Sequence, residues 1–429
     1  MLPDIRQNDY LYNVPKFELD RSDIAGLLAE LKGFHEHFAD CFRRSELRDN
    51  FFRYMAGQFS QLERKSIEPI AFAVEGGKVR AMQRFVSDAS WDDDRIMSKY
   101  RSLVAEDLGH PDGAIVFDES GFVKKGNDSI GVSRQYCGTI GKVDNCQVGV
   151  FAAYTSPHGY ALIDKRLYIP EHWFSDDYCA KREKCNLPSD VTFKTKPQLA
   201  AEMLLDLAAR PQLAFRYVLA DSVYTASPEF IEAAEGLTGV TYLGQVPENT
   251  LCWPKNPSVI KKESKYRGET RIKKVLTDSS NKPTSFKTLI SGINDFFWYR
   301  RTVSEGTKGP IEYEFTKRRV ILAHQGLPLK TVWLLARRTL GEDPQYSYFI
   351  SNAPVSTRLE KFVWLSGLRW SIEQCFEETK TELGMDQYEV RKFPGWHHHI
   401  LTCMLAHYFL WHLKIRLGKK SSSYYAIAA

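Results

Sequence analysis

The chain of 429 residues lacks the features that mark secreted, disulfide-stabilised or membrane proteins. Its eight cysteines are scattered without a CxxC pair, and its N-terminus has no basic segment followed by an apolar one. We therefore expect a reducing, cytoplasmic compartment. No low-complexity block or internal repeat interrupts the ordinary globular composition, and the length suffices for two or three domains.

A long uninterrupted apolar run is also missing. The most apolar stretch, His399–Leu417, contains His407, His412 and Lys414. It is too short and too polar for a membrane span of about 20 residues. We therefore expect no membrane partner and interpret this stretch as a buried or interface helix.

A strong overall charge is absent as well. The net charge of +5 is modest for this length and does not by itself indicate a polyanionic partner. The charge is unevenly distributed, however, because residues 254–274 carry eight lysines and arginines against two glutamates, a local charge of +6. Such a cluster favours a phosphate-rich partner.

The first hundred residues are predicted to be helical. Apolar side chains recur at spacings of three and four in 23–41, 46–62 and 76–85, with Pro69 and the Gly76-Gly77 pair marking turns. Lysines and arginines punctuate these helices. They suit contact with a phosphate backbone, and they suit a solvated surface equally well.

From residue 114 the apolar pattern becomes that of buried strands. Ala114–Phe117 is a short apolar run that ends at Asp118, and Arg216–Ala220 is another that ends at Asp221. The predicted order is βββαβαβ. Its strands are 114–117, 145–154, 160–169, 216–220 and 240–246, and its helices are 196–209 and 228–235. The first and fourth strands thus both end in a carboxylate.

The stretch after residue 248 departs from this pattern and is predicted to be a β-rich insertion. It contains the basic cluster, several aromatic residues, and strand-like segments at 286–290, 296–303, 311–315, 318–323 and 331–336. The buried-strand pattern returns at 346–350. Residues 356–383 are then predicted to form one long helix.

That helix carries its charges on one face. At about 3.6 residues per turn, Arg369, Glu373, Glu377 and Lys380 share a face, and apolar residues occupy the other. Taken alone, the pattern is typical of an exposed helix whose ion pairs contribute roughly 0.2–0.5 kcal/mol each. The strand-end aspartates add a second interpretation.

Asp118, Asp221 and Glu373 form a candidate metal site. A strand-end aspartate is usually a helix cap, but neighbouring strands would place two such carboxylates side by side, and a helix docked on the sheet would add a third. Two carboxylates about 4 Å apart repel by about 4 kcal/mol at an effective dielectric near 20. Mg²⁺ relieves this repulsion and also binds substrate phosphate. We therefore expect two Mg²⁺ ions, with Mn²⁺ as a substitute, and phosphodiester chemistry.

Several motifs follow one another along most of the chain. They are Glu63-Arg-Lys65, Pro69-Ile-Ala71, 117–126, 134–147, 220–224 and 369–391. This ordered set resembles the insertion-sequence transposases with an Asp-Asp-Glu site, in the cut-and-paste group with a β-rich insertion before the glutamate. The spacing Arg-x3-Glu-x6-Lys from Arg369 to Lys380 is similar to the signature of that group, although Ser366 stands where relatives often have a tyrosine.

The resemblance implies an α/β fold with an RNase H-like mixed sheet flanked by helices, interrupted by the β-rich insertion and preceded by a helical domain. Five parts are expected. They are a helical DNA-binding domain (1–110), the first part of the catalytic core (111–248), the insertion (249–345), the second part of the core with the glutamate helix (346–395), and a C-terminal helix for dimer or DNA contact (396–429).

The resemblance implies Mg²⁺-dependent cutting at terminal inverted repeats, followed by joining of the 3′-hydroxyl ends to target DNA. In relatives with this insertion, the cutting step can pass through a hairpin on the transposon end. The expected partners are duplex DNA and a second copy in a synaptic homodimer, at a prokaryotic nucleoid. Asp118, Asp221 and Glu373 would be catalytic and bind the metal, with Glu377 as a rival one turn away. The alternatives are a structure-selective nuclease and a non-catalytic DNA-binding repressor derived from a transposase.

The expected DNA contacts are basic or aromatic residues near the carboxylates or in the insertion. They are Lys124, Lys125, Arg134, Arg369, Lys380, Lys261, Lys262, Arg267 and Trp298. Trp298 is the first candidate to stack on a flipped base, a contact that contributes about 1–3 kcal/mol. The rings of His397–His399 cannot all face one point on a helix, so we expect a DNA-facing or solvated cluster there rather than a metal site.

Overall fold

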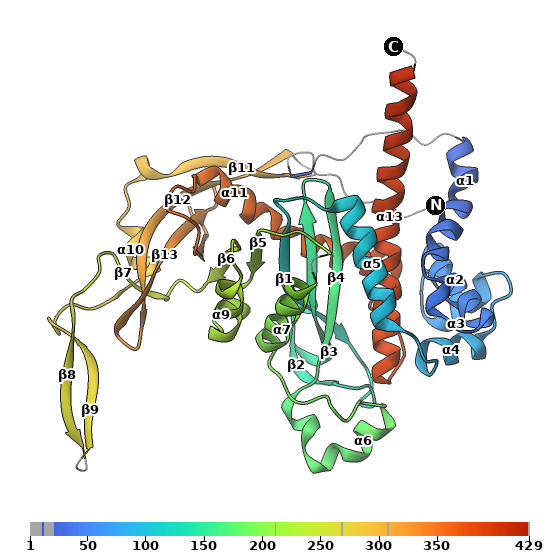
Figure 1. The fold of residues 1–429 in the computed structure, drawn as a ribbon, viewed down its shortest axis with the longest axis horizontal. Coiled ribbons are helices and arrows are strands. Elements are labelled where there is room, and N and C mark those ends of the chain that lie inside the picture. The colour runs from blue at the N-terminus through green and yellow to red at the C-terminus, as the bar shows by residue number, and fades with distance from the viewer. Residues whose placement is uncertain (1–10, 13–20, 211, 267–268, 307–308, 428–429) are drawn as a thin grey trace. The chain divides into compact units, whose positions relative to one another are not determined.

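The computed structural model describes residues 11–12, 21–210, 212–266, 269–306 and 309–427, and the chain divides into two compact units (Figure 1). Unit 1 contains residues 1–216 and 369–429, and unit 2 contains residues 217–368. Unit 2 is therefore one continuous stretch between two segments of unit 1. Among the described helices, none combines the length and apolar character that a membrane crossing needs.

Unit 1 begins with helices, as predicted. They are α1 (Arg21–Glu36), α2 (Ser45–Gln58), α3 (Ile67–Ala73), α4 (Val79–Ser87) and α5 (Asp93–Leu108). Helix α5 was not predicted, although it has a clear start signal. The side chain of Asp92 accepts a hydrogen bond from the Arg95 amide, and Asp93 and Asp94 lie in the first turn, where negative charge is favourable.

The sheet of unit 1 is antiparallel. Its strands are β1 (Ala114–Val123), β2 (Ser133–Cys137), β3 (Lys142–Ser156) and β4 (Gly159–Tyr168). Strand β3 pairs with each of the other three. The prediction that the first strand ends at Asp118 is wrong. Asp118 lies opposite Phe151 in mid-strand, because β1 continues to pair with β3 as far as Val123.

Helices follow the sheet in sequence. Helices α6 (Cys179–Lys184) and α7 (Lys196–Ala209) come after β4, and α7 packs on β3 and β4. Helix α7 has the predicted bounds because a Thr195–Gln198 capping box starts it. Helix α12 (Trp370–Leu383), near the end of the chain, also packs on the sheet, where the centres of the Phe376 and Phe151 rings lie 5.2 Å apart.

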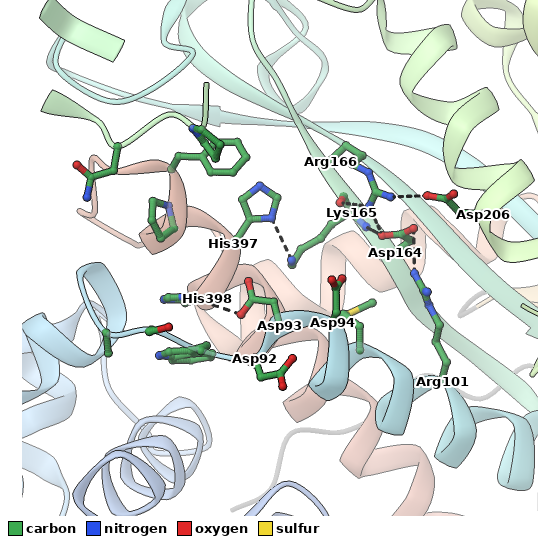
Figure 2. Close-up of a pocket in the computed structure, with 18 of the residues that line it drawn as sticks. Asp92, Asp93, Asp94, Arg101, Asp164, Lys165, Arg166, Asp206, His397 and His398 are labelled. Atoms are coloured by element: carbon green, nitrogen blue, oxygen red, sulfur yellow. Dashed lines mark hydrogen bonds and ion pairs between the residues drawn. The ribbon is translucent and has the colours of Figure 1, made fainter. Parts of the chain in front are cut away.

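A buried ion-pair network cross-links three elements of unit 1 (Figure 2). Asp164 of β4 is 2% exposed and contacts Arg101 of α5 at 2.9 Å and Arg166 at 2.5 Å. Arg166 also reaches Asp206 of α7 at 3.2 Å. The network borders a polar cavity of about 720 Å³. Asp164 thus links β4 to α5 through Arg101, and Arg166 links β4 to α7 through Asp206, so removal of Asp164 would leave the buried Arg101 without its partner.

The prediction of a solvated or DNA-facing histidine cluster is wrong, because His398 and His399 are buried in helix α13 (Phe393–Ile427). His399 bonds the Tyr54 hydroxyl at 2.8 Å, and His398 bonds the Val86 carbonyl at 2.8 Å. Burial lowers the pKa of His399 to about 3, so its imidazole is neutral. These rings join α13 to the N-terminal helices. The stretch 399–417 is largely buried, as predicted.

Unit 2 contains a mixed sheet, in the order β5-β6-β14-β13-β12-β7-β10, with β11 also on β12. Strands β5 and β6 are parallel, and the other pairs are antiparallel. Its strands are β5 (Tyr217–Ala220), β6 (Thr241–Val246), β7 (Leu251–Trp253), β10 (Thr284–Ser285), β11 (Tyr299–Gly306), β12 (Gly309–His324), β13 (Leu327–Arg338) and β14 (Tyr346–Ser351). A separate hairpin joins β8 (Val259–Tyr266) and β9 (Glu269–Leu276).

The helices of unit 2 correct two predictions. They are α8 (Ser222–Thr225), α9 (Pro228–Gly236), α10 (Phe286–Ser291) and α11 (Leu359–Leu368). The strand predicted at 286–290 is helix α10, because the Ser285 side chain caps its start by accepting from the Thr288 amide. The single helix predicted over 356–383 is two, α11 and α12, separated at Arg369.

The fold class agrees with the prediction. Antiparallel strands β1, β3 and β4, then a helix, then the parallel pair β5–β6 are the strand pairings of an RNase H-like α/β fold. The helical N-terminal segment and the β-rich stretch between β6 and β14 are also present. In unit 1, strand β1 carries Asp118, and helix α12, which packs on the sheet, carries Glu373.

Candidate active site

Arg369 brings two of the predicted carboxylates together in unit 1. Its Nη2 donates to Glu373 Oε1 at 2.7 Å, and its Nη1 lies 4.0 Å from Asp118 Oδ2. The three side chains are between 18% and 30% exposed, so they are accessible and yet partly desolvated. The guanidinium offsets the repulsion that the two carboxylates would otherwise exert on each other.

The accessible stripe of α12 faces this cluster. Trp370, Glu373, Glu377 and Lys380 are its exposed or half-buried positions, whereas Ile372 and Cys375 are fully buried. This is the predicted charged face. Glu377 is more exposed than Glu373, and the Arg369–Asp118 contact lies on the Glu373 side.

Lys380 fastens α12 to β1. Its ammonium donates to the Gly121 carbonyl at 3.1 Å and to the Thr139 hydroxyl at 2.7 Å. Burial lowers its pKa. Lys380, which was predicted as a phosphate contact, thus donates to one backbone carbonyl and one side-chain hydroxyl, and its contact with DNA stays a prediction.

Lys124 has a similar environment. Its Nζ donates to the Tyr388 carbonyl at 2.9 Å and lies 3.3 Å from the centre of the Tyr388 ring. Burial lowers the pKa of Lys124 to about 7. The residue connects β1 to the segment that follows α12, and its predicted role at the DNA also stays a prediction.

Lys65 is one of the N-terminal cations that suit a phosphate backbone by sequence, and in the structure it is a positioning residue. It is 8% exposed, and its ammonium donates to the carbonyls of Gln58 and Glu382, the latter in the last turn of α12. Gly384 ends that helix at φ +71°, and a Cβ there would lie 2.6 Å from Lys65 Cβ. The available signal was the Glu63-Arg-Lys65 motif, whose partner is more than three hundred residues away in sequence.

Asp221 lies in unit 2 at the end of β5, as predicted. Its Oδ1 accepts from the amides of Val223 and Tyr224, so it caps the short helix α8. The cap orients the Asp221 carboxylate at the end of β5.

The other predicted DNA contacts occupy varied environments. Lys125, Arg134, Lys261 and Lys262 are exposed. Trp298 is 7% exposed, with the Arg338 guanidinium carbon 4.3 Å from its ring centre. Arg267 lies outside the described residues.

The chemistry of the carboxylates fits a divalent metal. Asp118 and Glu373 offer partly exposed oxygen ligands, and an acidic pair with oxygen donors is what Mg²⁺ requires from a protein. The Oδ1 of Asp118 accepts a hydrogen bond from the Glu119 amide at 2.8 Å, and its Oδ2 lies 4.0 Å from Arg369 Nη1.

Comparisons with known proteins agree with this chemistry. Residues 37–310, which include Asp118 and Asp221 but not Glu373, match the model of the DDE superfamily endonucleases. The chain is 25% identical over 350 residues to a probable transposase for insertion sequence element IS701 from Microchaete diplosiphon, across 80% of this chain and 77% of that protein.

A solved structure of the piggyBac transposase synaptic complex with hairpin DNA aligns with 92% of this chain and 73% of its own, at 8% identity and a TM-score of 0.42. The family model and the IS701 relative confirm the resemblance to insertion-sequence transposases of the Asp-Asp-Glu type. Since the family model covers more than half of its residues, this chain belongs to the DDE superfamily of endonucleases.

Proposed function

We propose that the chain is a cut-and-paste DNA transposase that hydrolyses phosphodiester bonds at the ends of its own element and joins the 3′-hydroxyl ends to a target. The observation that carries the proposal is the contact of Arg369 with both Asp118 and Glu373. A structural ion pair needs one carboxylate, and this cation has two beside it. The presence of a second carboxylate is explained if Asp118 and Glu373 together hold divalent metal during catalysis.

In this proposal Asp118, Asp221 and Glu373 hold two Mg²⁺ ions, with Mn²⁺ as a substitute. Bound metal would supply an activated water or hydroxyl and stabilise the leaving oxygen of an in-line displacement. Without metal, Arg369 supplies the positive charge that offsets the repulsion between the two carboxylates of unit 1, and it offers a planar donor set that suits a phosphate. Asp221 is oriented by the amides at the start of α8.

The test uses Asp118→Asn, Asp221→Asn and Glu373→Gln, each incubated with duplex DNA that ends in the inverted repeats of the element and with Mg²⁺. We expect each variant to bind the duplex and to lose cleavage by at least about a hundredfold. Glu377→Gln is the matched control on the same stripe and should retain cleavage. Cleavage by Glu373→Gln together with loss in Glu377→Gln would move the site by one helical turn.

Joining of a pre-cleaved end to a plasmid separates a transposase from a nuclease. A transposase joins the 3′-hydroxyl end, whereas a structure-selective nuclease cleaves and joins nothing. If the chain binds end DNA and shows neither reaction with Mg²⁺ or Mn²⁺, it is a DNA-binding repressor and the proposal is wrong. Relatives that act on paired ends suggest a homodimer at the nucleoid, and light scattering with and without end DNA measures its assembly.

Exposed cations on β2 and just after the end of β1 are the proposed phosphate contacts. Lys125 follows β1, and Arg134 lies on β2. We propose that both neutralise DNA phosphates and that Trp298 stacks on a base once Arg338 moves from its ring. Trp298→Ala should reduce cleavage and leave binding of the unbroken duplex unchanged. Reduced binding by that variant instead would assign Trp298 to the core of unit 2.

A further inference from the structure

The hairpin β8–β9 projects from the rest of unit 2 (Figure 1). In the described residues its two strands pair only with each other. A lone two-stranded hairpin is marginally stable in water. Ile260 and Ile272 are 50% and 63% exposed, so the hairpin buries few of its apolar groups. Such an element gains order from a partner.

Its register places like charges directly opposite one another. Lys261 lies across from Lys274, and Lys262 lies across from Lys273. All four side chains are exposed. Like charges in opposed positions destabilise a hairpin, whereas opposite charges would stabilise it. The arrangement therefore costs stability, and a polyanion that binds the lysines removes that cost.

The two pairs lie on opposite faces of the ribbon. Because successive side chains in a strand alternate between faces, Lys261 and Lys274 share one face and Lys262 and Lys273 share the other. A single flat surface of phosphate could reach only one pair. A partner that engages both pairs must lie on both sides of the hairpin.

A groove of duplex DNA has this geometry, because it has a phosphate backbone on each side. A β-ribbon with side chains on both faces is about 10 Å thick. The major groove is about 12 Å wide and admits a two-stranded ribbon, whereas the minor groove is only about 6 Å wide. At the root of the hairpin, a cavity of about 550 Å³ is lined by Lys261, Lys274 and the start of β13 at Leu327 and Pro328, which leaves space for a backbone beside the first pair.

We infer that the hairpin β8–β9 enters the major groove of duplex DNA edge-on and contacts the phosphates of one strand through Lys261 and Lys274 and of the other strand through Lys262 and Lys273. This inference rests on the proposed function, because duplex DNA is the partner. It adds Lys273 and Lys274 as contacts and specifies how the insertion holds the duplex.

The test measures the dissociation constant for a labelled duplex by anisotropy at several salt concentrations. Each phosphate contact contributes about 0.9 to the slope of log affinity against log salt. We expect Lys261→Ala with Lys274→Ala, and Lys262→Ala with Lys273→Ala, each to lower the slope by about 1.8, and all four changes by about 3.6. Lys282→Ala with Lys287→Ala removes the same charge from unit 2 outside the hairpin and should leave the slope unchanged.

A charge reversal separates binding from folding. Lys273→Glu places a carboxylate opposite Lys262, so the hairpin should become more stable to heating while the affinity for DNA falls. If only one lysine pair lowers the slope, the hairpin lies flat on the duplex, and if neither pair does, it contacts no DNA. Either result overturns the inference and leaves the proposed function intact, because the wild-type chain still cleaves the duplex. Failure of the wild-type chain to bind or cut the duplex would instead overturn the proposed function.

Discussion

Arg369 determines the charge balance of the carboxylates in unit 1. It contacts Glu373 one helical turn away and Asp118 on the sheet. Without metal the guanidinium is the positive charge between them. A divalent ion would compete with it for the same oxygens, so the stability of unit 1 and its affinity for metal depend on the same residue.

Replacement of Arg369 by Ala should lower the free energy of unfolding in EDTA by about 1–3 kcal/mol, because two partly buried carboxylates lose a charged partner. The stabilisation by Mg²⁺ should then be larger than in the wild-type protein. Thermal unfolding with EDTA and with a Mg²⁺ series measures both. Arg391→Ala removes an exposed pair with Asp128 and should change stability by at most about 1 kcal/mol. An unchanged response to Mg²⁺ in Arg369→Ala would argue against a metal at this pair.

Lys124 should make stability depend on pH in the alkaline range. Burial lowers its folded pKa from 10.5 to about 7. Between these values the unfolded chain holds the proton and the folded chain has released it, so the free energy of unfolding rises as pH rises from about 7 to about 10. In Lys124→Met this contribution is absent. The difference between wild type and variant, from urea unfolding at each pH, should increase by no more than about 1.4 kcal/mol per pH unit.

The exposed neighbour provides the control for that experiment. Lys125→Met should show the wild-type pH dependence, because its side chain is in water in both states. If Lys124→Met also retains the wild-type slope, the ammonium is not desolvated in solution, and Lys124 returns to the set of residues that can reach DNA.

At the scale of elements, helix α12 is the part whose placement the proposed activity requires. Lys380 and Lys65 both hold the C-terminal part of this helix, Lys380 to β1 and Lys65 to the N-terminal helices. Gly384, which ends α12, allows Lys65 to lie close to the helix, because Gly384 adopts φ +71° and has no Cβ. Contacts far from Glu373 therefore set where its carboxylate lies.

We expect Gly384→Ala to lower the free energy of unfolding by about 2–4 kcal/mol, from a left-handed backbone and a close contact with Lys65. Cleavage should fall as well. Gly141→Ala is a matched control, since Gly141 has φ +65° and open space around it. That variant should cost only about 1–2 kcal/mol. Equal losses in the two variants would show that the Lys65 contact contributes nothing to the position of α12.

At the scale of the whole molecule, a contiguous unit 2 is inserted into unit 1. The inserted segment carries the densest positive charge of the chain, in a hairpin that pairs only with itself among the described residues. We therefore expect that the proposed DNA contacts of the hairpin can be removed without loss of the sheet that bears Asp118.

Deletion of residues 259–276 tests this expectation. Ser258 accepts a hydrogen bond from the Thr277 amide at 2.9 Å, so the two ends are adjacent and a two-residue Asn-Gly turn can join them. We expect a melting temperature close to that of the wild type and a loss of affinity for duplex DNA. Calorimetry and anisotropy measure the two quantities. A large fall in melting temperature would mean that the hairpin is part of the core of unit 2.

The types of most core elements and the identity of the acidic residues were predictable from sequence. Helix α7 has its predicted bounds, since a capping box and apolar periodicity are local signals. Asp221 ends a strand as expected. Local signals failed where a different local interaction prevailed, as at α10, where the Ser285 cap overrides a strand-like apolar pattern.

Sequence by itself determined the α/β class and the types of most core elements, because these follow from periodicity and residue type, although strand β2 was not predicted. Only the tertiary structure decided that Asp118 lies in mid-strand and that Arg369 joins it to Glu373. The same holds for Lys380, whose acceptor at Gly121 lies 259 residues away. A pattern along the chain shows which face of an element is buried. It does not show which side chain from a distant segment will meet that face, because packing between segments decides that.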